Sequence, residues 1–152
     1  MPRGTRRLPD RCIAELGRAD LILHAGDFVT VGVLDGLRRL APVEGVAGNM
    51  DEEALRSSLP ERRVVEVDGV RLGMVHDPGP ARGRAERLRS WFRRCDAVVY
   101  GHTHMPEVEA SDDGWILNPG SPTERRRAPA RTMIVLRITA ERLAPQLLEV
   151  GA

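Results

Sequence analysis

Short apolar runs alternate with amphipathic segments over the first part of the chain. The runs at 21–23 and 42–46 are each followed by glycine and an acid or amide, a pattern typical of buried parallel strands. Helices are predicted at 8–18, 31–40 and 51–58. The first has proline near its start and glycine near its end, and the third opens with acidic residues that suit a helix N-terminus.

Farther along the chain the pattern changes to hairpins. Two alternating runs at 63–67 and 70–75 flank Asp68-Gly69, a pair that strongly favours a tight β-turn. The remaining predicted elements are an amphipathic helix at 84–94, a buried strand at 97–100, and antiparallel strands at 115–117, 132–139 and 143–150. Strand–helix alternation followed by hairpins predicts an α/β sandwich of mixed sheets flanked by helices, formed by one domain over 1–152.

Composition limits the kinds of partner that this chain can have. Its 152 residues suit one globular domain, and 23 basic residues balance 22 acidic ones, so neither nucleic acid nor a membrane surface is indicated. No apolar run reaches the ~18 to 20 residues of a membrane helix. The basic N-terminus lacks the apolar stretch of a signal peptide, and two distant cysteines fit a reduced compartment, so a cytoplasmic location is expected.

All the basic residues are arginines. The simplest interpretation is codon usage in a GC-rich genome, with runs such as 125–127 mostly solvated at the surface. The alternative is that guanidinium groups bind phosphate, because their planar fork matches phosphate oxygens.

Side chains that can bind metal follow four of the predicted strands. They are Asp27 after 21–23, Asn49 after 42–46, His76 after 70–75, and His102 and His104 after 97–100. In α/β sheets, sites assemble in the crevice at the carboxyl ends of the strands. Each motif alone is commonplace, since Gly-Asp and Gly-Asn usually form turns; the ordered combination is the signal.

This donor set suits a hydrolase that uses two metal ions. Two divalent ions about 3.5 to 4 Å apart neutralise a phosphoester and generate hydroxide near neutral pH. Imidazole with carboxylate favours manganese, iron, zinc or nickel over calcium. Asp27 is the candidate bridge between the ions. His24 lies inside a predicted buried strand and is interpreted as a satisfied core histidine.

The ordered motifs resemble the calcineurin-like metallophosphoesterases. These motifs are Gly26-Asp27, Gly48-Asn49-Met50-Asp51, His76, Gly101-His102-Thr103-His104 and Asn118-Pro119-Gly120-Ser121. The most similar branch is the small YfcE-type phosphodiesterases, which include a eukaryotic retromer subunit, and the resemblance runs from residue 8 to about 148.

The resemblance implies a role for each motif. Asp27 is expected to bridge two metals, Asn49, His76 and His102 to complete the second site, and His104 to belong to the first. Asp27, Asn49 and His76 are the expected catalytic residues. The turn at 118–121 is expected to buttress the histidine loop.

Three departures from the family pattern matter. The family opens with a buried strand ending in Asp-x-His, which is absent here, so an upstream translation start is expected, with genuine loss as the alternative. An empty slot in the sheet is expected where that strand would lie. Met50 occupies the position of a proton-donating histidine, which favours diesters with good leaving groups. Asp77 replaces the usual glycine after His76.

The function expected from these residues is phosphodiester hydrolysis by a metal-bound hydroxide at a dinuclear site, impaired by the missing Asp-x-His. Divalent ions, manganese first, are the expected cofactors, and a small-molecule or nucleotide-type phosphodiester is the expected substrate. Assembly into a homo-oligomer stays open. The alternatives are a non-catalytic interaction scaffold of the same fold, as in the retromer subunit, and a regulatory nucleotide binder.

Overall fold

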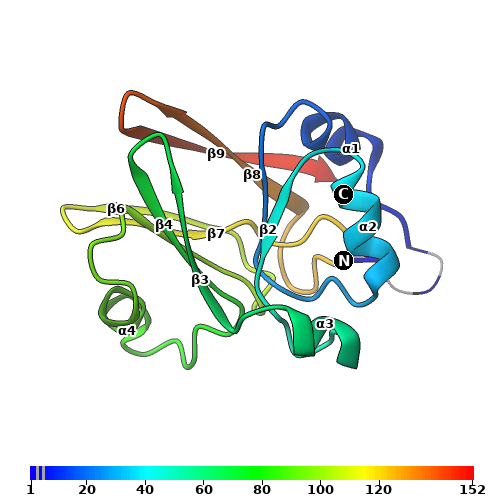
Figure 1. Ribbon diagram of the computed structural model, residues 1–152, viewed down its shortest axis with the longest axis horizontal. Helices are drawn as coiled ribbons and strands as arrows, with labels where there is room; N and C mark the ends of the chain where they lie inside the picture. The colour runs from blue at the N-terminus through cyan, green and yellow to red at the C-terminus, as the bar shows by residue number, and fades with distance from the viewer. Residues whose placement is uncertain (3, 5) are drawn as a thin grey trace.

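The computed structural model describes residues 1–2, 4 and 6–152 and arranges them as a layered α/β sandwich (Figure 1). Its helices are α1 (Asp10–Leu16), α2 (Val31–Arg38), α3 (Glu53–Ser58) and α4 (Arg84–Trp91). Its strands are β1 (Ile22–His24), β2 (Val43–Gly45), β3 (Arg62–Val67), β4 (Val70–Val75), β5 (Ala97–Tyr100), β6 (Glu107–Ser111), β7 (Gly114–Asn118), β8 (Arg131–Thr139) and β9 (Arg142–Gly151).

The larger sheet has five strands in the order β3-β4-β5-β7-β6. Its centre is parallel, from β4 through β5 to β7, and antiparallel β3 and β6 form its edges. The predicted hairpin is confirmed, and its turn residues Asp68 and Gly69 have φ of 47° and 82°, a left-handed conformation that an Asp-Gly pair adopts readily.

Alternation along the central strands gives the larger sheet two apolar faces. On β5, Ala97 and Val99 pack toward the smaller sheets, together with Leu72, Met74 and Leu117. Val98 and Tyr100 point the other way and pack under Leu88 of α4. Figure 1 shows α4 on one side of the molecule and α1, α2 and α3 on the other. The carboxyl ends of β4 and β5 therefore lie between two packed layers.

Two smaller sheets form the second β layer. Strands β1 and β2 pair in parallel, and β8 pairs with β9 as an antiparallel hairpin. The outer face of β1 is covered by α2 and α3, through contacts among Ile22, Leu34 and Leu55. Within the described residues, β2 is the only strand hydrogen-bonded to β1.

Several sequence expectations need correction. Helix α1 spans Asp10–Leu16 rather than 8–18, and α2 ends at Arg38 rather than at 40. Strand β6 was not predicted, because it is an edge strand whose residues are mostly exposed and only weakly apolar. Helix α4 ends at Trp91 rather than at residue 94, because Phe92 leaves the helical region and Arg94 has φ of 63°. Helix α3 begins at Glu53 rather than at 51. None of the helices in the described part of the chain is long and apolar enough to cross a membrane.

Candidate metal centre

Four predicted ligands meet where β1, β2, β4 and β5 end. The Nε2 atom of His76 lies 2.8 Å from Oδ1 of Asn49 and 3.3 Å from Oδ2 of Asp27. The Nδ1 atom of His102 lies 3.2 Å from the same Asn49 oxygen and 3.4 Å from Nε2 of His76. These side chains come from four separate loops, so the fold alone brings them together.

The spacing of these donor atoms fits a metal ion. Bonds from Zn²⁺ to histidine nitrogen or carboxylate oxygen are about 2.0–2.2 Å long, which places neighbouring ligand atoms about 2.9–3.5 Å apart. Among the residues that the structure describes, no three His, Cys, Asp or Glu side chains form a metal-binding group by themselves. The amide oxygen of Asn49 lies within hydrogen-bond distance of both His76 and His102 and so connects them in the cluster.

Backbone carbonyls fix which nitrogen of two histidines is free. The Nδ1 atom of His76 lies 2.7 Å from the carbonyl oxygen of Ala25, and Nδ1 of His104 lies 2.6 Å from that of Glu124. A carbonyl only accepts, so each Nδ1 carries the proton and each Nε2 remains available. Histidines that bind metals are commonly oriented in this way.

His104 stands apart from the other four residues. Its Nδ1 atom is hydrogen-bonded to the carbonyl oxygen of Glu124, and in the described part of the chain it has no hydrogen bond with Asp27, Asn49, His76 or His102. The structure thus brings together the four residues predicted for one ion. It does not bring His104 into this cluster.

Electrostatics couple Asp27 and His76. Burial by itself would raise the pKa of Asp27, but hydrogen bonds from His76 and from the amide of Met50 outweigh it and lower the pKa to about 2. Burial would lower the pKa of His76, but the bonds to Asp27 and Ala25 outweigh that effect and raise it. An ion bound by Nε2 of His76 would therefore compete with the proton that this pairing favours.

Asp51, which sequence analysis left out of the site, joins two of the ligand loops. Its carboxylate is 4% exposed and accepts the amides of Gly48 and Val29, each at 2.7 Å. In return, Oδ1 of Asp27 accepts the amide of Met50 at 2.8 Å. The acidic run at 51–53 was interpreted as a helix start. The position of Asp51, three residues after Gly48, is the feature of the sequence that could have predicted a carboxylate bound to the loop amides.

Backbone strain gathers in the same loops. Asp27, Val29, His102 and His104 have φ of 62°, 78°, 66° and 60°, a left-handed region that L-residues rarely adopt. Val29 is the least tolerant of these, because its side chain is β-branched. Each such residue costs about 1–3 kcal/mol, and this kind of strain persists where the surrounding structure holds a functional geometry.

Gly48 makes the close approach of the loops feasible. A Cβ at this position would lie 2.1 Å from the amide nitrogen of Asp27 and 2.3 Å from its Oδ1 atom. No side chain can be accommodated there. The glycine of the Gly-Asn motif is therefore required by the packing of the two loops, and not only by its own turn.

His24 is not the fully satisfied core histidine that the sequence suggested. Its ring stacks on Phe28 at 3.7 Å, but its Nδ1 atom is buried without a hydrogen-bond partner among the described residues. Burial, reinforced by the nearby positive charges, lowers its pKa to about 3, so the ring is neutral.

The predicted buttress of the histidine loop is confirmed. The amide nitrogen of buried Asn118 donates to the carbonyl of Gly101 at 3.3 Å and to Oγ1 of Thr103 at 2.9 Å. Asp77 closes a turn instead of facing the cluster, since its carboxylate accepts the amide of Gly79 at 2.8 Å.

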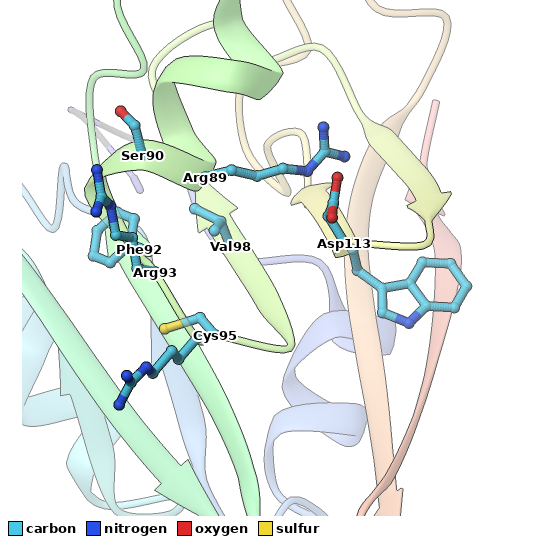
Figure 2. Close-up of a pocket in the computed structure, with 9 residues that line it drawn as sticks. Arg89, Ser90, Phe92, Arg93, Cys95, Val98 and Asp113 are labelled. Carbon is cyan, nitrogen blue, oxygen red and sulfur yellow. The ribbon is translucent and has the colours of Figure 1, made fainter.

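A pocket of about 410 Å³ lies at the opposite end of β5, away from these residues. Figure 2 shows the guanidinium of Arg89 directed toward Asp113, on the other side of the pocket from Arg93. Its charged groups do not converge on one point. The donor cluster, and not this pocket, is therefore the candidate functional site.

The sequence matches the calcineurin-like phosphoesterase superfamily domain over residues 4–141. A probable metallophosphoesterase of Methanothermobacter thermautotrophicus is 36% identical over 154 residues, which span 100% of this chain and 88% of that protein. A phosphodiesterase of Methanocaldococcus jannaschii is 27% identical over 116 residues, or 66% of each chain. Wild-type Vps29 of Entamoeba histolytica, solved with Zn²⁺, shares the fold with a TM-score of 0.77 at 23% identity, over 99% of this chain and 94% of that one.

Proposed function

This chain belongs to the calcineurin-like phosphoesterase superfamily, and from that premise we propose that it hydrolyses small-molecule phosphodiesters, nucleotide-type diesters included, with divalent metal ions as cofactors. The observation that carries the proposal is the meeting of Asp27, Asn49, His76 and His102, with donor atoms 2.8–3.4 Å apart. A similar phosphodiesterase from Methanocaldococcus jannaschii supports the choice of diesters.

These four side chains would hold one ion, and Asp27 with His104 would hold another. Bound there, divalent ions would neutralise the phosphate charge and supply an activated water. Two protein donors hold an ion more weakly than four, so the second ion is expected to bind with the lower affinity. Manganese is the first metal to test; zinc, nickel and iron share its preference for imidazole and carboxylate.

The residues of the chain also limit the substrate. Met50 follows Asn49, is 38% exposed and carries a thioether, which has no proton to donate to a leaving group. Substrates whose leaving group is stable as an anion, such as aryl diesters, do not need that proton. This favours activated diesters over alkyl monoesters.

Hydrolysis of a chromogenic aryl phosphodiester tests the proposal, with Mn²⁺ present and again after chelation. Turnover is expected with the metal, and chelation, Asn49→Ala or Asp27→Asn is each expected to abolish it. Asp35→Asn is the matched control for Asp27→Asn, since Asp35 lies on the exposed face of α2 beside Arg38. Turnover that survives both chelation and Asp27→Asn would refute the proposal.

The alternative, suggested by the similarity in fold to Vps29, is an interaction scaffold without catalysis. The meeting of four donor side chains, with His76 oriented by the carbonyl of Ala25, favours the enzyme. Metal binding without any turnover of aryl diesters would favour the scaffold instead.

A further inference from the structure

Arg126 reaches the candidate site from a distant turn. Its Nη1 atom donates to the carbonyl oxygen of His102 at 3.3 Å, across 24 residues of sequence. Its backbone is held at φ of 48°, a left-handed conformation that is uncommon for arginine. The guanidinium is therefore anchored to the backbone of one proposed ligand residue, while the side chain remains exposed.

No carboxylate neutralises this charge at close range. In the described residues, the nearby carboxylate of Glu124 is paired with Arg6 at 3.2 Å, and Arg126 has no ion pair within 4.0 Å. Its positive charge is nevertheless felt at His104, where it adds to burial in lowering the pKa. Arg126 thus places a cation that has no ion pair among the described residues beside the loop at 102–104.

The geometry of the guanidinium leaves it free to bind an anion. It has five N–H donors in a planar fork, and the carbonyl of His102 accounts for one of them. Pairs between arginine and phosphate oxygens are commonly bidentate and charge-assisted. A phosphoester held at the donor cluster would lie next to His102, the residue whose carbonyl anchors this guanidinium.

The neighbouring arginines of the run at 125–127 do not share this position. Arg125 donates to the carbonyl of Ala128 at 2.9 Å, which closes its own turn. Arg127 is exposed and makes no hydrogen bond or ion pair within the described part of the chain. Position 126 is therefore set apart by contact with the site, and position 127 provides a matched control.

We propose that Arg126 binds a phosphate oxygen of the substrate and selects for the phosphoryl anion at this site. The proposal rests on the proposed function, since it assigns a substrate contact at the same centre. Direct phosphate contact distinguishes it from the arginines that composition alone places at the surface.

Binding of inorganic phosphate, measured by calorimetry with and without Mn²⁺, tests this residue apart from turnover. Arg126→Ala is expected to weaken binding about ten- to hundredfold, as expected for loss of a hydrogen bond to a charged group. Arg126→Lys is expected to recover part of the loss, because it keeps the charge but not the fork. Arg127→Ala is expected to stay within twofold of the wild type.

Turnover supplies a second measurement. With the aryl diester, Arg126→Ala is expected to raise KM more than it lowers kcat, since phosphate is contacted before and during reaction. Phosphate binding unchanged by Arg126→Ala, equal losses in Arg127→Ala, or no phosphate binding by the wild type would each overturn the assignment. If the wild type binds phosphate through Arg126 but does not hydrolyse the diester, the proposed function fails and the phosphate contact stands.

Discussion

Replacing Asp51 by alanine is expected to destabilise the protein and to loosen the metal centre together. The carboxylate accepts two amides at 2.7 Å, those of Gly48 and Val29, from a position that is 4% exposed. A hydrogen bond to a charged group contributes about 1.5–3 kcal/mol, and its loss leaves a backbone donor without a partner. Because the two bonds share one carboxylate, we expect a combined loss of about 3–5 kcal/mol rather than a simple sum.

That loss is a large part of the about 5–15 kcal/mol that stabilises a typical domain. At about 2–4 °C per kcal/mol for a chain of this size, the melting temperature should fall by about 6–20 °C. Urea unfolding followed by the fluorescence of Trp91 and Trp115 measures the change in free energy. The free energy of unfolding of Asp51→Asn is expected to lie between those of the wild type and Asp51→Ala. The asparagine side chain keeps one acceptor oxygen, but its NH₂ group brings two donors toward the backbone N–H groups of Gly48 and Val29.

Asp51→Asn also tests whether Asp51 positions the ligands. Asp51 links the loop of Asp27 to the loop of Asn49, so Asp51→Asn should weaken Mn²⁺ binding about 10–100-fold, as loss of a residue that orients ligands typically does. Asp112→Ala, at an exposed turn, is the control and should stay within about 0.5 kcal/mol of the wild type. A loss of stability below about 1 kcal/mol in Asp51→Ala, or unchanged Mn²⁺ affinity in a folded Asp51→Asn, would refute the reasoning.

Two further predictions concern the same loops. Gly48→Ala places a Cβ 2.1 Å from the amide nitrogen of Asp27 and should abolish Mn²⁺ binding in calorimetry. The control is Gly32→Ala on α2, where the nearest atom to the new Cβ is 3.8 Å away and binding should be unchanged. Retained Mn²⁺ binding in Gly48→Ala would contradict the close approach of the loops. The hydrogen bond to Asp27 raises the pKa of His76, so protons compete with a metal ion for its Nε2 atom. Mn²⁺ affinity should therefore fall up to about tenfold per pH unit below that pKa and level off above it. Calorimetry between pH 5 and 9 measures this dependence, and an affinity independent of pH would rule out proton displacement at His76.

Much of the fold follows from local pattern. The apolar runs, the Asp-Gly turn and the amphipathic helices predicted nearly every element, because burial on a strand or helix face repeats with a period that a sequence displays directly. Strand β6 was not predicted because an exposed edge strand buries too few side chains to show such a pattern. The end of α4 was not predicted because the left-handed conformation of Arg94 is set by its surroundings and not by its residue type.

The sequence by itself also determined the candidate ligands, since each follows a strand and strand ends share one edge of a sheet. Only the tertiary structure decided that Asp27, Asn49, His76 and His102 meet while His104 stands apart, that Asp51 joins two loops, and that Arg126 alone of three arginines contacts the site. The physical reason is distance along the chain: these contacts span up to 53 residues, and their geometry is set by how two β layers pack rather than by any local preference.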